Sequence, residues 1–417
     1  MKFFSKITCF FVALFILSAM FVLPSAAADI DVYEKLYDNK GGVMSISHRG
    51  DTVSYPENSL EAVLSACNKG ADMISVSVRL SKDGELILAE SGDLSSFCKT
   101  YYKDASQLTA KELQKISLYE TDASVSGCKV ATLEEVLKKL KGKSLLILDN
   151  SWEYRNEILS FCTENEAEDK VIIRTDASSK EIALWLSETG AKVAVIGIYD
   201  GAIIWSANSH LTTLSESGQP AVQYQSKNYF NEMYQNFTSK RYSSAENARA
   251  VAPMYDKDLC GQREDNETGW DEMINRGFSV IETNCIEGLE NYISESEKCL
   301  NDLEALIEKG ERVDKSLYST VSANNFSDAL KNAKQASENK NTSLGVLRES
   351  YSKLAETMKN LTFGGFEDTQ RGNLNVTAGK VAAVIIFGSL LLAGEIYVCK
   401  MGAGRKKKSG SKKQIIG

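Results

Sequence analysis

Imidazole chemistry in this chain depends on two side chains, because the 417 residues contain only His48 and His210. His48 begins the motif His48-Arg49-Gly50, which directly follows the apolar run 43–47. A histidine can transfer protons near neutral pH, and an arginine can hold two oxygens of a phosphate group. We take His48 as the candidate catalytic residue and Arg49 as a candidate substrate-binding residue. His210 stands apart from this motif, and we interpret it as a surface or structural histidine.

The elements that must position His48 are short apolar runs that alternate with helical segments between residues 41 and 293. Eight alternating units over about 250 residues predict an α/β fold, a parallel TIM barrel, with a doubly wound open sheet as the second possibility. Functional groups of such a barrel lie at the carboxyl ends of its strands, which is where His48 stands. The expected strands are 43–47, 73–78, 144–148, 171–173, 193–198, 221–224, 250–253 and 279–281, and helices include 59–69, 133–141 and 180–188.

Both ends of the chain carry targeting signals. Residues 1–28 combine two lysines, an apolar stretch and small residues, which predicts a cleaved secretory signal peptide rather than an uncleaved anchor. Residues 380–399 form an apolar run with one acidic residue, long enough as a helix to cross a hydrocarbon core of about 30 Å. A buried core helix is the alternative for this run. Seven Lys and Arg in the tail 400–417 predict a cytoplasmic C-terminus and a single-pass bacterial membrane protein with an extracellular N-terminal part.

The net charge of −8 hides an asymmetry between these compartments. Of the 48 Lys and Arg, seven lie in the tail, two in the signal and one at Lys380, which leaves 38 between residues 29 and 379. All 56 Asp and Glu except Glu395 lie in the same region, so it carries a charge near −17. An acidic ectodomain disfavours nucleic acid as a partner. Its seven cysteines show no metal-ligand spacing, and Cys98 with Cys128 is the one pair that we consider for a disulfide.

Residues 294–362 differ from the region before them, because they predict long polar helices and no strands. In the last segment, apolar residues recur at spacings of three and four from Leu344 to Leu361. This pattern predicts a seam that faces partner helices, and hence a three-helix bundle. The segment resembles the FIVAR-type helical modules of bacterial surface proteins, and it could equally be a plain spacer. Residues 363–379 contain several glycines and are expected to form a linker.

Four motifs lie between residues 45 and 91, namely His48-Arg49-Gly50, Pro56-Glu57-Asn58-Ser59-Leu60, Gly70-Ala71-Asp72 and Lys82-Asp83-Gly84. In their order and spacing they resemble the glycerophosphodiester phosphodiesterase family. The resemblance continues in the segments "LTAKELQKI" and "TLEEVLKKL" and returns at residues 265–293. It implies a TIM barrel over residues 29–293 and metal-dependent hydrolysis of glycerophosphodiesters in lipid metabolism. In this family two histidines act as acid and base, and two carboxylates on the second strand hold the metal.

The chain departs from the family at the positions that carry this chemistry. Ser75 and Ser77 stand where the family has its paired carboxylates, and Glu90 stands where it has the second histidine. Two hydroxyls offer a hard divalent cation no negative charge. A further metal carboxylate of the family maps to Leu148 or Asp149, and its neighbouring lysine maps to Asn150 or Ser151. His48, Arg49 and Glu57 remain as a remnant phosphate site.

Three functions are compatible with these observations. The first is a catalytically degenerate barrel without a cofactor, displayed on the cell surface as a structural module or a binder of a phosphate-containing small molecule. The second is an active phosphodiesterase in which Glu57, Glu90 and Asp149 hold Mg²⁺ or Ca²⁺ and His48 is the acid or base. The third is a surface adhesin that acts through the helical region. We expect the first, with no metal ligands in the site.

Overall fold

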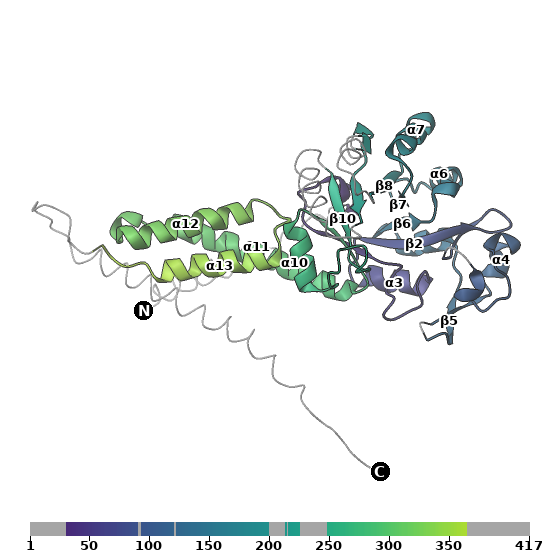
Figure 1. The fold of residues 1–417 in the computed structure, drawn as a ribbon, viewed down its shortest axis with the longest axis horizontal. Coiled ribbons are helices and arrows are strands. Elements are labelled where there is room, and N and C mark those ends of the chain that lie inside the picture. The colour runs from purple at the N-terminus through teal and green to yellow at the C-terminus, as the bar shows by residue number, and fades with distance from the viewer. Residues whose placement is uncertain are drawn as a thin grey trace, which may run out of the picture. The chain divides into compact units, whose positions relative to one another are not determined.

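A closed barrel of parallel strands forms the centre of the computed structural model, which describes residues 31–90, 93–120, 122–199, 213, 214, 216–225 and 248–364 (Figure 1). Within these ranges, each strand pairs with its neighbour and β11 pairs back with β1. This closure confirms the predicted barrel and excludes the open sheet. Each barrel strand overlaps one of the eight apolar runs. The strands are β1 (Met44–Ser47), β2 (Met73–Leu80), β6 (Leu145–Asp149), β7 (Val171–Thr175), β8 (Ala194–Tyr199), β9 (Ala221–Tyr224), β10 (Arg249–Pro253) and β11 (Val280–Thr283).

Helices lie outside the strands and begin at residues suited to that role. The side chains of Ser59, Thr132 and Ser178 each accept a hydrogen bond from a backbone N–H in the first turn of the following helix. Such caps satisfy donors that the helix itself leaves unpaired. The helices of the barrel are α3 (Leu60–Asn68), α5 (Leu133–Leu140), α6 (Arg155–Glu164), α7 (Ser179–Thr189), α10 (Glu267–Asn275) and the first turns of α11 (Ile286–Glu311).

The interior of the barrel is apolar toward the amino ends of its strands and polar toward their carboxyl ends. Side chains of alternate residues point inward, so β6 contributes Leu145 and Ile147 to the buried interior cluster and then presents Asp149. In the same way β7 contributes Ile172 and then Arg174. Apolar packing therefore fixes these strands, and the last inward positions of β6 and β7 are left for polar groups.

A short helix closes the amino end of the barrel. Helix α2 (Val32–Tyr37) places Leu36, which is fully buried, in the interior cluster. The guanidinium of Arg249, at the start of β10, donates to the backbone carbonyls of Lys35 and Asp38 at the end of this helix and to Gly42. A cation at a helix C-terminus is favoured by the helix dipole. Arg249 therefore fastens α2 to the strands.

The segment between β2 and α5 leaves the barrel and builds a small core of its own. It contains β3 (Leu86–Leu88), which pairs antiparallel with β2, the two-stranded sheet of β4 (Ser117–Tyr119) and β5 (Val125–Lys129), and α4 (Ala110–Leu113). Cys98 and Cys128 both belong to its buried cluster. Both are free thiols here, and the disulfide that we considered is not formed. Burial raises the pKa of Cys98 to about 12, so this thiol stays protonated.

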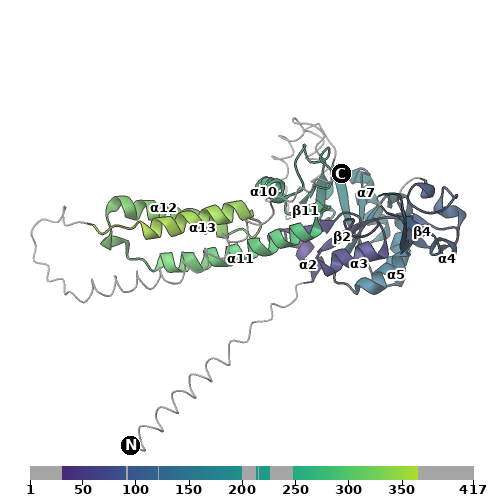
Figure 2. The ribbon, with the colours of Figure 1, turned by 90° about the horizontal axis from the view of Figure 1, so that it is seen from below.

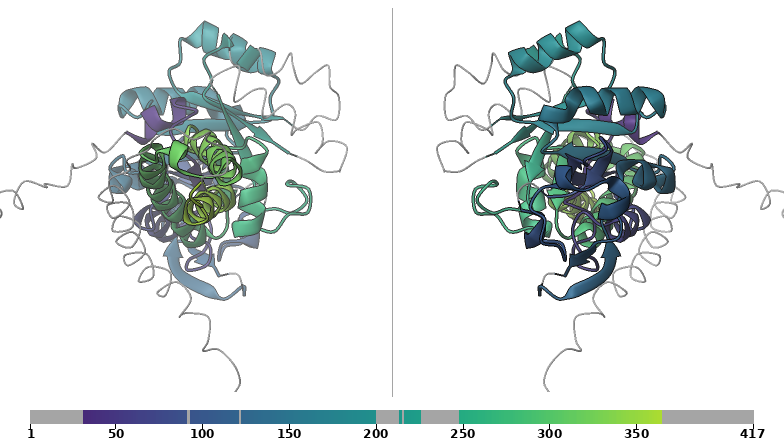
Figure 3. Two further views of the ribbon diagram at one scale, coloured as in Figure 1. Left: turned by 90° about the vertical axis from the view of Figure 1, so that its left-hand side faces the viewer. Right: turned by 90° about the vertical axis from the view of Figure 1, so that its right-hand side faces the viewer.

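Three helices follow the last strand and run side by side (Figures 2 and 3). Helix α11 is continuous across residues 293 and 294, where the sequence indicated a change of domain. Its second half packs with α12 (Thr320–Ser337) and α13 (Leu344–Lys359) around a buried cluster that contains Leu303, Phe326 and Leu354. Asp271 of α10 accepts hydrogen bonds from Tyr292 and from the backbone of Gly345, which joins α13 to the barrel.

Several expectations concern residues outside the described part of the chain. These are the signal peptide at 1–28, His210, most of the linker at 363–379, the membrane span at 380–399 and the cytoplasmic tail at 400–417. Among the described residues, no helix is long and apolar enough to cross a membrane.

Candidate functional site

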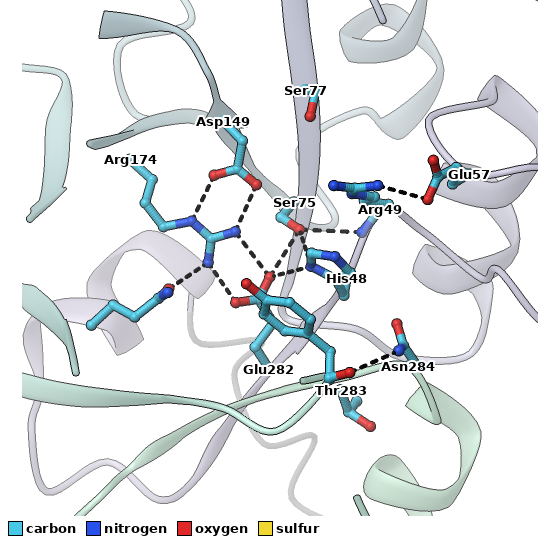
Figure 4. A network of polar contacts seen from close by, with 12 residues as sticks. His48, Arg49, Glu57, Ser75, Ser77, Asp149, Arg174, Glu282, Thr283 and Asn284 are labelled. Carbon is cyan, nitrogen blue, oxygen red and sulfur yellow. Dashed lines mark hydrogen bonds and ion pairs between the residues drawn. The ribbon is translucent and has the colours of Figure 1, made fainter. Parts of the chain in front are cut away.

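The polar side chains at the carboxyl ends of the strands form one connected network (Figure 4). His48 follows β1, Ser75 lies on β2, Asp149 ends β6, Arg174 lies on β7 and Glu282 lies on β11. The parallel register brings these positions to the same level, because Ser77 pairs with Asp149 and Ile46 pairs with Glu282. The barrel therefore assembles in one place residues that are far apart in the sequence.

Arg174 is the centre of the network. Its Nε and Nη2 donate to the two carboxylate oxygens of Asp149, each at 2.6 Å. Nη1 and Nη2 donate to the two oxygens of Glu282 at 2.5 and 2.9 Å, and Nη1 also donates to Gln223 at 2.7 Å. All five N–H groups of this guanidinium are thus engaged. Burial alone would lower the pKa of Arg174, but the two carboxylates raise it well above its ordinary value.

Glu282 links Arg174 to the candidate catalytic histidine. One of its oxygens lies 2.9 Å from Nδ1 of His48 and accepts a hydrogen bond from Ser75 at 3.0 Å. Burial alone would raise the pKa of Glu282, yet Arg174 and His48 hold it below its ordinary value. The His48 ring stacks on Tyr255 with ring centroids 3.6 Å apart and planes 4° from parallel. His48 is therefore fixed from two sides.

Arg49 forms a second group of ion pairs beside the first. Its Nη1 donates to Glu57 at 2.9 Å, and its Nη1 and Nη2 reach the two oxygens of Glu90 at 2.6 and 3.0 Å. The backbone here is unusual, because Arg49 has φ of 57° and Gly50 has φ of 87°. A Cβ on Gly50 would lie 2.7 Å from the backbone of Ala62, so this turn requires glycine. This turn directs the side chain of Arg49 toward the carboxylates of Glu57 and Glu90.

The Pro56–Leu60 motif has structural roles that the sequence did not reveal. Asn58 has φ of 56°, and its side-chain Oδ1 accepts a hydrogen bond from the backbone N–H of Ser77 at 2.8 Å. Ser59 caps α3. Asn150 donates from its amide to the hydroxyl of Ser77 at 3.2 Å. The two serines at the family's carboxylate positions are thus held by neighbouring side chains.

A cavity of about 440 Å³ opens above these two groups at the carboxyl end of the barrel. Arg79 on its wall donates to Glu153 at 3.1 Å. Its lining is mainly polar, and it includes His48, Arg49, Ser77, Arg79, Asp149, Asn150, Trp152, Glu153, Arg174, Thr175, Asp176, Gln223 and Tyr255. This volume suits a small ligand.

The structure separates the residues that the second of the three hypotheses grouped around a metal. Glu57 and Glu90 both bind Arg49, whereas Asp149 binds Arg174. Across the described residues, no three His, Cys, Asp or Glu side chains are grouped as metal ligands. Each carboxylate is held by a guanidinium, and the positions on β2 carry hydroxyls, so the donor set does not fit a divalent cation.

Sequence reasoning missed the two residues with the most contacts in this network. Arg174 interrupts the apolar run of β7, and a charged residue in a buried strand is a signal that could have identified it. Glu282 lies in the equally buried β11 and carries the same signal. Their partners could not be assigned from the sequence, since Glu282 lies 234 residues from His48 and 108 from Arg174.

The fold and the site together define an eight-stranded parallel barrel with a polar mouth at the carboxyl ends of its strands. Residues 48–216 match the sequence model of the glycerophosphoryl diester phosphodiesterase family. The chain therefore resembles this family over the part of the barrel that carries His48, Arg49, Glu90 and Arg174.

Individual relatives agree with this resemblance. A glycerophosphodiester phosphodiesterase of Caldanaerobacter subterraneus subsp. tengcongensis is 32% identical over 105 residues, which are 24% of this chain and 42% of that protein. The protein YqiK of Bacillus subtilis is 31% identical over 138 residues, which are 31% of this chain and 56% of that protein. The chain thus matches less than two thirds of the length of these relatives.

A solved structure supports the fold. The glycerophosphoryl diester phosphodiesterase of Parabacteroides distasonis superposes with a TM-score of 0.50 at 18% identity, covering 62% of this chain and 90% of that one. At this identity the likeness concerns the barrel architecture alone.

Proposed function

We propose that this chain is a catalytically degenerate barrel of the glycerophosphodiester phosphodiesterase type, which acts on the outer side of a cell membrane as a ligand-binding or structural module. One observation carries this proposal. Arg174 binds both oxygens of Asp149 and both oxygens of Glu282, so a fixed side-chain cation holds these two carboxylates at the mouth.

The chemistry of phosphodiester hydrolysis explains why this arrangement disfavours turnover. Attack on phosphorus needs one group that takes a proton, another that gives one, and a cation that offsets charge on the phosphoryl oxygens. Here His48 is the single imidazole among the described residues of the mouth. Glu90, at the second histidine position, is bound to Arg49. Arg174 has no free N–H with which to contact a phosphoryl oxygen.

The proposed location rests on the sequence. An N-terminal signal peptide and an apolar run followed by seven positive residues support a single-pass protein with its barrel outside the cell. Helix α13 ends at Lys359, shortly before the predicted linker and span. The three helices after the barrel would then lie between the barrel and the membrane. An adhesin that acts through these helices is the alternative for this region.

One observation favours residual hydrolysis as a second candidate function. Glu282 fixes the ring of His48 at Nδ1, and a carboxylate that orients an imidazole is a common element of acid–base sites. Such an activity would use His48 without the pairing of Glu57, Glu90 and Asp149 that a metal site requires.

Turnover and metal binding test the proposal. The purified full-length protein is incubated with glycerophosphocholine in the presence of Mg²⁺ or Ca²⁺, and release of glycerol phosphate is measured. We expect no release above background and no stoichiometric binding of either ion by titration calorimetry. Release that the change His48→Ala abolishes would contradict the proposal, and if it persisted in EDTA it would support the second candidate.

A further inference from the structure

Glu90, which stands at the family's second histidine position, pairs with Arg49 at the mouth of the barrel. It follows β3 and forms a two-point ion pair with Arg49, with Oε2 at 2.6 Å from Nη1 and Oε1 at 3.0 Å from Nη2. Nη2 donates a hydrogen bond to Oε1, and Oε2 lies within ion-pair distance of Nη1, so Glu90 takes up the Nη1–Nη2 side of the guanidinium, from which an arginine can also hold a phosphate. Glu90 therefore occupies the face of Arg49 that an anionic ligand would need.

Burial makes the Glu90 pair the more important of the two that Arg49 forms. The side chain of Glu90 is 20% exposed, whereas that of Glu57 is 41% exposed. Water and salt screen an exposed pair more strongly than a buried one. Both carboxylates raise the pKa of Arg49 above its ordinary value, although burial acts in the opposite direction. An incoming anion would have to compete with both carboxylates, of which Glu90 is the less exposed to water and salt.

The other cations of the mouth are engaged as well. Arg174 uses all five donors on Asp149, Glu282 and Gln223, and Arg79 pairs with Glu153. The cavity lining carries three guanidiniums, those of Arg49, Arg79 and Arg174, and three carboxylates, those of Asp149, Glu153 and Asp176. Behind this lining, Glu57, Glu90 and Glu282 add three more carboxylates that pair with Arg49 or Arg174. In this part of the chain an anion would therefore meet guanidiniums that already form ion pairs, and more carboxylates than guanidiniums.

We propose that Glu90 is a specificity-determining residue that occupies Arg49 and closes the barrel mouth to anionic phosphate ligands. The mouth then takes polar ligands that carry no negative charge, through hydroxyl and amide groups such as those of Thr175, Asn150 and Gln223. The inference rests on the proposed function, because it concerns the ligand of a barrel that does not hydrolyse it. It replaces the phosphate-containing ligand that the sequence led us to expect.

Removal of one charge tests this inference. The change Glu90→Gln keeps the shape of the side chain and releases Arg49 from its buried carboxylate. We expect the full-length Glu90→Gln protein to bind inorganic phosphate about tenfold or more tightly than the unaltered protein in titration calorimetry, since charge-assisted hydrogen bonds differ from neutral ones by this order. The unaltered protein should show a dissociation constant above about 10 mM, which is less than 3 kcal/mol of binding.

Two control variants separate the role of Glu90 from general electrostatics. Asp176→Asn removes one negative charge from the cavity lining without releasing an arginine, so it should raise phosphate affinity much less than Glu90→Gln does. Arg49→Met combined with Glu90→Gln should abolish the gain. Near-ultraviolet circular dichroism verifies that each variant is folded.

The outcomes distinguish this inference from the proposed function. Phosphate binding by the unaltered protein in the micromolar range would overturn the inference, whatever the variants do, and so would a gain that survives Arg49→Met. Hydrolysis of glycerophosphocholine by the unaltered protein would overturn the proposed function. Absence of hydrolysis together with no gain in Glu90→Gln would overturn the inference alone.

Discussion

Two arginines are buried inside this barrel, one toward each end, and they are stabilised by different kinds of partner. Arg174, near the carboxyl ends of the strands, binds the carboxylates of Asp149 and Glu282. Arg249, at the amino end, binds the backbone carbonyls of Lys35, Asp38 and Gly42. Carboxylates raise the pKa of Arg174, whereas burial lowers the pKa of Arg249 to about 10.

The comparison shows how one residue type serves two purposes in one barrel. Carbonyl dipoles satisfy the donors of Arg249 but bring little negative charge, so this arginine acts as a cap that joins α2 to the strands. Arg174 neutralises carboxylates that would otherwise repel each other at the mouth. Loss of Arg174 would leave the carboxylates of Asp149 and Glu282 without their cation. Loss of Arg249 would leave only neutral backbone carbonyls without a donor.

The largest loss of stability should follow from Arg174→Met. Because the change leaves Asp149 and Glu282 as uncompensated buried carboxylates, we expect the free energy of unfolding to fall by about 3–5 kcal/mol. Urea unfolding followed by circular dichroism measures this loss. Adding Asp149→Asn and Glu282→Gln should recover a large part of it, since the three groups act as one network. A triple variant no more stable than Arg174→Met would contradict the account.

A smaller effect should follow from Arg249→Met. The loss removes hydrogen bonds to the end of α2 but strands no carboxylate, so we expect a decrease of about 1–3 kcal/mol by the same measurement. The comparison rests on the difference between the stability lost in Arg249→Met and that lost in Arg174→Met. Equal losses for the two arginines would show that their partners matter less than burial itself. Hydrogen exchange should locate the change in residues 32–37, because Arg249 holds this helix.

The smallest effect should be a dependence on pH at the amino end of the barrel. Glu290 of α11 accepts a hydrogen bond from Ser45, and burial, with Asp72 and Glu297 nearby, raises its pKa to about 7 although Lys35 acts in the opposite direction. The folded state therefore holds a proton that the unfolded state releases near pH 4.5. Stability is lost as pH rises between these values, and we expect a loss of up to about 2 kcal/mol.

Glu290→Gln removes this titration. Its free energy of unfolding should vary less than that of the unaltered protein between pH 4.5 and 7.5, measured by urea unfolding in matched buffers. The low pKa of Glu282 acts below this window, because its contribution is lost only as pH falls through the folded value. Parallel profiles for the two proteins would contradict the role of Glu290.

The order of strands and much of the site's chemistry could be predicted from local pattern. Alternation of apolar runs with capped helices identified every barrel strand within a few residues, because each unit buries its own apolar side. The excursion between β2 and α5 was missed, since strands as short as β3 and β4 give too few residues for a periodic signal. The resemblance to the family, and the motif spacing that it supplies, identified Ser75, Ser77 and Glu90 as departures from the family's pattern.

What the sequence by itself determined is therefore the barrel, the position of His48 and Arg49 at the end of a strand, and the departures from the family's metal ligands. The tertiary structure decided which charges meet. Closure of the barrel sets Glu282 beside His48 and Arg174, and the excursion returns Glu90 to Arg49. Local sequence encodes the conformation of each strand, but an ion pair depends on distance through space, and that distance is fixed only when the strands pair across the closed sheet and the segment after β2 folds back onto it.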